Sequence, residues 1–101
     1  MKLKNRFEDE RYLLISVFWD GGHFIYLKDK VQKTESLGIP SKPLDIETFW
    51  KKHKEDKDYC LPCELLLYFE KKVMVAENSV VEWGITLERL EKFREFIEKN
   101  N

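Results

Sequence analysis

The fold is decided by a stretch that reads YLLISVFW and occupies Tyr12–Trp19. Its apolar side chains fall on both alternating faces, with Tyr12, Leu14 and Phe18 on one and Leu13, Ile15, Val17 and Trp19 on the other. Such a strand is covered on both sides, or is central in a sheet with a helix on one face. Asp20–Gly22 follows, and His23–Leu27 then resumes the apolar pattern. Because glycine tolerates the positive φ of tight turns, the region predicts a β-hairpin.

The polar segment after the hairpin predicts a loop and then a helix. Lys30–Asp45 contains Gly38, Pro40 and Pro43, which favours a crossing loop. Asp45 is suited to cap a helix whose apolar side chains recur at helical spacing, at Ile46, Phe49, Trp50 and His53. The nearly all-charged run Lys51–Asp58 predicts that this helix ends in solvent.

The region from Tyr59 to Gly84 is ambiguous. Leu65–Phe69 and Val73–Val75 read as two strands, but one helix beginning at Pro62 also fits, because proline is accepted in the first turn. The β-branched valines favour strands, with a further one at Val80–Trp83. Whether residues 64–76 form a helix or two strands stays open at this point.

The last element is predicted to be a helix with a wide apolar face. Thr86 is a suitable N-cap, and the apolar residues that follow cover about half of the helix circumference: Leu87, Leu90, Phe93, Phe96 and Ile97. The predicted order is ββαββ(β)α. We therefore expect one small α+β domain over residues 1–101, with an antiparallel sheet covered on one face by two helices.

Composition limits the function classes. The 101 residues are 43% hydrophobic and 14% aromatic, which suffices to close a core and argues against disorder. The 18 Lys and Arg are balanced by 19 Asp and Glu, so the net charge is −1. Proteins that bind by neutralising nucleic-acid phosphates or anionic membranes are usually basic, so neither partner is expected.

The sequence also bears on compartment and origin. The longest nearly apolar run is Tyr12–Trp19, far short of the ~20 residues of a spanning helix. Acidic residues separate it from the basic N-terminus, and no small-residue cleavage site follows, so we expect a cytoplasmic protein without a signal peptide. A single alanine, with abundant Lys, Glu, Phe and Ile, indicates an AT-rich genome of bacterial, archaeal or viral origin. Enrichment in Lys and Glu is equally typical of hyperthermophiles, and both explanations stay open at this point.

The motif Cys60-Leu61-Pro62-Cys63 is the strongest candidate for chemistry. It resembles the Cys-x-Pro-Cys of the thioredoxin active site, in which a thiolate at a helix N-terminus attacks and a second thiol resolves the mixed disulfide. The charged run Lys51–Asp58 stands where that fold has a buried strand, and no proline follows Pro62, so no family is assigned. A thiol-redox module using Cys60 and Cys63 is kept as an alternative.

The same cysteines also allow a zinc site within this first alternative. Two cysteines two residues apart supply half of a tetrahedral site, and His53, with His23 as the fourth ligand, would complete it. The preferred interpretation is simpler: Cys60 and Cys63 are small, partly buried thiols, and His53 lies at the boundary of the core near Phe49 and Trp50. No cofactor is therefore expected.

Other catalytic patterns are weak. Asp20 and His23 flank the hairpin turn and form the kernel of a general-base pair, but both residue types are common in turns. Ser16 has no neighbouring glycines that would form a nucleophile elbow, and no glycine-rich phosphate loop is present. We expect no catalytic residues and no enzyme activity.

Binding is the remaining function class. Trp19, Trp50 and Trp83 are the candidate binding residues, because tryptophan is enriched at interaction hot spots. We expect a protein–protein interaction or inhibitory, regulatory module whose partner is another protein or a second copy of itself. A nucleic-acid-binding module is the second alternative, in which strand aromatics (Phe18, Trp19, Phe24, Tyr26) would stack on bases.

Overall fold

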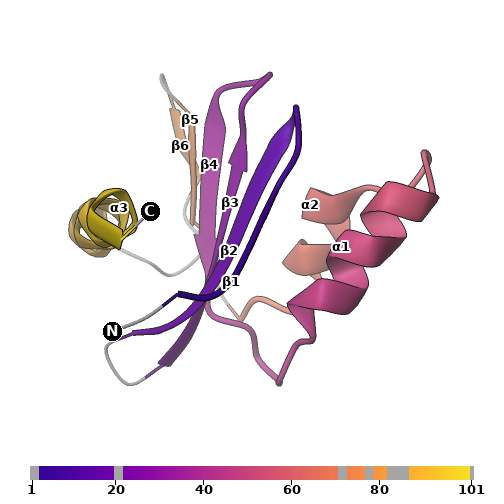
Figure 1. Cartoon of the computed structure of the whole chain (residues 1–101). Helices are drawn as coiled ribbons and strands as arrows, with labels where there is room; N and C mark the ends of the chain where they lie inside the picture. Colours follow the sequence, from indigo (N-terminus) through magenta and orange to yellow (C-terminus); the bar gives the residue numbers. More distant parts are fainter. Residues whose placement is uncertain (1–2, 20–21, 71–72, 77–78, 82–86, 101) are drawn as a thin grey trace.

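The predicted hairpin supplies the second and third strands of a six-stranded antiparallel sheet (Figure 1). The computed structural model describes residues 3–19, 22–70, 73–76, 79–81 and 87–100. The strands are β1 (Leu3–Glu8), β2 (Tyr12–Trp19), β3 (Gly22–Asp29), β4 (Thr34–Gly38), β5 (Val73–Ala76) and β6 (Ser79–Val81). The helices are α1 (Ile46–Glu55), α2 (Leu61–Leu66) and α3 (Leu87–Asn100). The strands pair in chain order, and the predicted α+β class is confirmed.

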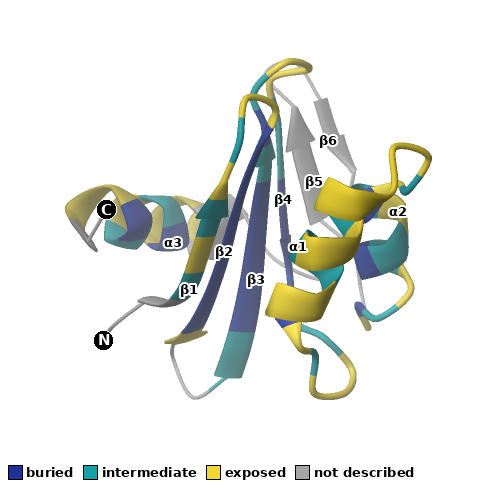
Figure 2. Cartoon of the chain, turned by 45° about the vertical axis from the view of Figure 1, so that its right-hand side comes forward, coloured by how far each residue is buried: buried dark blue, intermediate teal, exposed yellow. Residues whose placement is uncertain are grey.

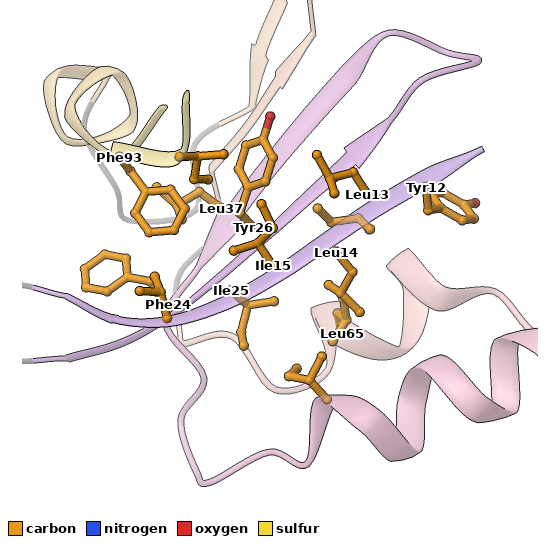
Figure 3. Packing of buried hydrophobic residues seen from close by; sticks show 14 of the residues in the cluster. Tyr12, Leu13, Leu14, Ile15, Phe24, Ile25, Tyr26, Leu37, Leu65 and Phe93 are labelled. Atoms are coloured by element: carbon orange, nitrogen blue, oxygen red, sulfur yellow. The ribbon is translucent and has the colours of Figure 1, made fainter. Parts of the chain in front are cut away.

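The helices lie on opposite faces of the sheet, with α1 and α2 on one side and α3 on the other (Figure 1). The ring of Phe93 in α3 lies 5.7 Å from that of Phe24, while the ring of Tyr12 meets His53 of α1 at 5.1 Å. Figure 3 shows Leu14 pointing away from α3, toward Leu65 of α2. The expectation that both helices cover one face was therefore wrong.

The two-sided apolar pattern of β2 explains this arrangement. The side chains of both its faces are buried from Tyr12 to Val17, and Figure 2 shows β2 and β3 largely in the buried colour. Each face had to be covered, so one layer of helices was insufficient. The prediction that Tyr12–Trp19 is covered on both sides is confirmed.

A partly buried polar network attaches α3 to the sheet. The hydroxyl of Tyr26 donates to Oε1 of Glu35 at 2.8 Å, and Nη2 of Arg94 forms an ion pair with Oε2 of the same carboxylate. Burial, together with the neighbouring Glu35 carboxylate, raises the pKa of the Tyr26 hydroxyl, which therefore stays protonated as a donor. Glu35 thus connects β3, β4 and α3.

Two strands were not predicted. β1 precedes the hairpin and pairs with β2, and β4 lies inside the segment Lys30–Asp45, where a loop was expected. In β4, Leu37 is fully buried, and Ser36 is also buried although it is polar. The sequence of β4 shows no alternation of apolar and polar residues, because polar residues stand at positions that the rest of the fold buries.

The ambiguous region contains a helix and then a strand. The preferred strand at Leu65–Phe69 is wrong, because α2 ends at Leu66 and Phe69 forms an isolated bridge with Pro40. The helical alternative is right for the beginning of this region, where proline stands in the first turn. Val73–Val75 lies in β5 as predicted, and Val80 and Val81 lie in β6.

The two longer helices were predicted correctly. The Asp45 carboxylate caps α1, accepting from the backbone N–H of Thr48 at 3.4 Å and from its hydroxyl at 2.7 Å. Helix α3 buries Phe93 and Ile97, as its periodicity indicates. The predicted cap Thr86 and residues 82–83 of the last predicted strand lie outside the described residues. None of the described helices is long and apolar enough to cross a membrane.

Candidate functional site

The first candidate site lies at the end of the central hairpin. The last pair between β1 and β2 is Leu3 with Val17, and β4 stops pairing with β3 at Ile25. The hairpin continues past both neighbours through the pair of Phe18 and His23, whose ring centroids are 5.0 Å apart. Both side chains lie on the sheet face that carries α1 and α2, because the alternation places them on the same side as Ile25.

A groove of about 360 Å³ runs beneath this projecting end. We call it the hairpin-end groove, and its lining residues are Phe18, His23, Pro40, Ser41, Lys42, Pro43 and Leu44. The Phe18 side chain forms one rim and is 57% exposed. The opposite wall is fixed, since the N–H of Ser41 donates to the carbonyl of Tyr68 and Pro40 bridges to Phe69. The groove is therefore a preformed, mainly apolar surface.

His23 is held in place by Ser16, with 2.6 Å between Nε2 and Oγ. Ser16 is fully buried in the strand, so its hydroxyl is not accessible to a substrate. Asp20, the proposed partner of His23, lies outside the described residues. Sequence reasoning missed the contact between Ser16 and His23, although the hairpin register, with residues 16 and 25 opposite each other, places them diagonally on one face.

The second candidate site is formed by the two cysteines. Cys60 and Cys63 form a disulfide, and Sγ of Cys60 accepts from the backbone N–H of Cys63 at 3.3 Å. Both cysteines are exposed, whereas Leu61 and Leu65 of the same segment are buried in the core. The disulfide therefore lies on the surface, while the buried leucines hold its segment on the core. The preferred interpretation of these cysteines as partly buried thiols was wrong.

A pocket of about 240 Å³ adjoins Cys60. This disulfide pocket is lined by Arg11, Tyr12, Leu27, Asp29, Gln32, Thr34, Ser36, Cys60 and Pro62. Asp29 is buried and accepts from Nε and Nη2 of Arg11 at 3.3 and 3.2 Å. Its other oxygen accepts from the N–H groups of Val31 and Gln32, both at 3.0 Å. Hydrogen bonding to Asp29 raises the pKa of Arg11, so the pocket contains a fixed cation beside a satisfied carboxylate.

The structure does not bring His53 together with the cysteines. Nε2 of His53 is 2.9 Å from Oδ2 of Asp9, in the turn between β1 and β2. Within the part of the chain that the structure describes, no group of three or more His, Cys, Asp or Glu residues is arranged to hold a metal ion. The ligand set of the zinc alternative is therefore not assembled.

Of the three predicted binding residues, only Trp50 has both its backbone and its side chain within the described part of the structure. Trp50 is half-buried on α1, with its ring 5.7 Å from that of Phe7 and 5.0 Å from that of His53. The backbone of Trp19 pairs with Gly22 at the end of β2. The side chain of Trp19 and the whole of Trp83 lie outside the described residues.

The strand aromatics differ in their exposure. Phe24 and Tyr26 are buried against Phe93 of α3, so neither ring offers a free face to a base. Phe18, by contrast, is exposed at the hairpin-end groove. This contrast was invisible in the sequence, because all three residues lie in equally apolar stretches.

Comparisons with protein families, curated proteins and solved structures find no match for this chain.

Proposed function

We propose that the protein is a protein-interaction module and that the hairpin-end groove is its docking surface. The observation that carries the proposal is the 57% exposure of Phe18 at the rim of an apolar groove. A large aromatic side chain loses water-exposed area when a partner covers it, and aromatic anchors seated in pockets dominate binding energies. Completing the burial of Phe18 would contribute on the order of 1–2 kcal/mol.

The rigidity of the groove supports the same proposal. Pro40 and Pro43 restrict one wall, and the hydrogen bond between Ser16 and His23 fixes the other. A surface that is already ordered loses little conformational entropy on binding, so more of the contact energy remains as affinity.

The lining residues define the chemistry of the partner. Among the described residues that line the groove, Lys42 alone carries a permanent charge, and its Nζ lies 5.4 Å from the ring centroid of Tyr68. The occupant that fits is a segment of another protein that inserts an aliphatic or aromatic side chain and carries an acidic residue beside it. The acidic residue would pair with Lys42, and the apolar one would pack between Phe18 and Leu44.

The test is selection of a random peptide display library on the immobilised protein. We expect enrichment of peptides with a large apolar residue next to Asp or Glu. Phe18→Ser should weaken binding of the selected peptides at least about tenfold, because it removes the aromatic rim. The matched control is Val31→Ser, which removes another exposed apolar side chain at a distant turn, where Val31 is 68% exposed, and should leave binding unchanged.

Three outcomes would contradict the proposal. The first is no enrichment of such peptides, and the second is equal loss of binding in the Phe18→Ser and Val31→Ser variants. The third is a wild-type dimer in sedimentation velocity that Phe18→Ser converts to a monomer, since the occupant would then be a second copy of this chain.

A further inference from the structure

We propose that the Cys60–Cys63 disulfide is a site of thiol–disulfide exchange, at which a peptide thiol bound in the disulfide pocket attacks Sγ of Cys60. This activity is separate from docking at the hairpin-end groove. It uses α2, Arg11 and Asp29, which take no part in lining that groove.

The position of the disulfide favours reactivity. A disulfide stabilises a fold mainly by closing a long loop, whereas this one spans a sequence separation of three residues. Both cysteines are exposed, and the buried side chains of Leu61 and Leu65 hold the segment on the core. A thiol can therefore reach the sulfurs without unfolding of the protein.

The two sulfurs are not equivalent. Cys60 lines the disulfide pocket together with Pro62 and Tyr12, whereas Cys63 is not part of the lining. A thiol seated in the pocket consequently meets Cys60 first. The N–H of Cys63, which donates to Sγ of Cys60, is placed to stabilise the thiolate of Cys60 in the second step, when Cys60 is released from the mixed disulfide.

The exchange proceeds in two steps. A peptide thiolate attacks Sγ of Cys60 and forms a mixed disulfide, while the bond between Cys60 and Cys63 breaks and its electron pair leaves on the sulfur of Cys63, which takes a proton from water. A second peptide thiolate then attacks the peptide sulfur of the mixed disulfide and releases Cys60 as a thiolate, which is protonated in turn. Two electrons and two protons thus pass from two peptide thiols to the protein disulfide, and a small-molecule disulfide reverses the reaction.

The pocket indicates which thiols fit. The side chain of Arg11 is 48% exposed although Asp29 engages its Nε and Nη2, so a carboxylate of the incoming peptide can approach the guanidinium. Thr34, Ser36 and Gln32 add polar groups to the lining. The substrate class is therefore a cysteine-containing peptide with a nearby carboxylate, and glutathione is a suitable probe.

The experiment exposes the oxidised full-length protein to reduced glutathione, stops the reaction with acid, and maps the mixed disulfide by mass spectrometry. We expect the glutathionyl group on Cys60. Single-cysteine variants extend the test with oxidised glutathione: Cys63→Ser, which retains Cys60, should be glutathionylated at least about tenfold faster than Cys60→Ser.

A charge variant tests the pocket itself. Gln32→Glu adds a carboxylate to the lining and should slow glutathionylation several-fold by repelling the carboxylates of glutathione. Thr48→Glu makes the same change of charge at an exposed position of α1 that lines neither the disulfide pocket nor the hairpin-end groove, and it should leave the rate unchanged. Equal labelling of the two cysteines, equal rates in the charge variants, or reduction no faster than global unfolding would overturn the proposal.

Discussion

Nε2 of His53 lies 2.9 Å from Oδ2 of Asp9, although the two residues are separated by 44 positions in the chain. Asp9 stands in the turn between β1 and β2, and His53 lies in the last turn of α1. The Asp9 carboxylate also accepts from the backbone N–H groups of Arg11 and Tyr12, at 2.9 and 2.7 Å. One side chain thus orders the turn and holds α1 against the sheet.

This arrangement predicts a loss of stability in acid. Burial acts to raise the pKa of Asp9, but the hydrogen bonds from the Tyr12 N–H, His53 and the Arg11 N–H outweigh it and lower the pKa from 3.8 to about 2. Because the folded-state pKa is the lower one, the contribution is complete above pH 4 and disappears as the pH falls toward 2. It amounts to about 1–2 kcal/mol after allowance for solvent screening.

Urea unfolding between pH 2 and pH 7 measures this contribution. Asp9→Asn should be less stable than the wild type at pH 7 and should show a shallower decline of the free energy of unfolding below pH 4. The control is Asp58→Asn, which changes an exposed carboxyl group. Parallel stability curves for the wild type and Asp9→Asn across this range would refute the assignment.

Glu35→Ala should destabilise the protein by about 2–3 kcal/mol, because it leaves the Tyr26 hydroxyl and the Arg94 guanidinium without their shared acceptor in a largely buried site. Lys92→Ala is the comparison, since it breaks the ion pair between Lys92 and Glu88. The side chains of these two residues are 62% and 79% exposed. That change should cost less than about 0.5 kcal/mol. Thermal unfolding of both variants checks the contrast, and equal losses would show that Glu35 does not hold α3 in place.

Gly38→Ala should be destabilising for a steric reason. A Cβ at this position would overlap three ring carbons of Phe69, whose side chain is buried. We expect a loss of about 1–3 kcal/mol, typical of overpacking. In a Phe69→Ala background the same substitution should cost much less, because the ring is gone. A double-mutant cycle by chemical denaturation measures this coupling, and additive effects would argue against the contact.

Reduction of the disulfide should cost little stability. The closed loop is so short that its chain entropy corresponds to about 2 kcal/mol at most. The reduced protein should therefore remain folded, with the same far-ultraviolet circular dichroism and a moderately lower melting temperature. In reducing buffer, the Cys60→Ser and Cys63→Ser variants should be about as stable as the reduced wild type, apart from small local effects. Global unfolding on reduction would instead make this bond an essential structural element.

Much of the architecture was readable from local patterns. The hairpin follows from two apolar runs around a glycine-containing turn, and α1 from a capping aspartate before a helical stripe. The strand β4 was not readable. Its burial depends on partners elsewhere in the chain, such as Arg94 for Glu35, rather than on an alternating pattern of its own.

The candidate sites were harder to predict than the fold. Cys60 and Cys63 were singled out from their spacing, but the pocket beside them requires Arg11 and Asp29, which lie in the first third of the sequence. The hairpin-end groove depends on β4, which delivers Pro40 to Leu44 beneath Phe18. Since that strand was expected to be a loop, no local signal placed these residues together. The diagonal contact of Ser16 with His23 was predictable from the hairpin register alone.

The chain-order pairing of the strands also has a consequence for how the protein forms. Among the first four strands, β2, β3 and β4 each pair with the strand made just before, so these contacts close short loops and need little search. During synthesis, the first four strands can assemble before the rest of the chain exists. The slow step is then addition of β5 to β4, because α1 and α2 lie between them in the chain. The sheet face destined for α3 stays open to water until that helix has been made.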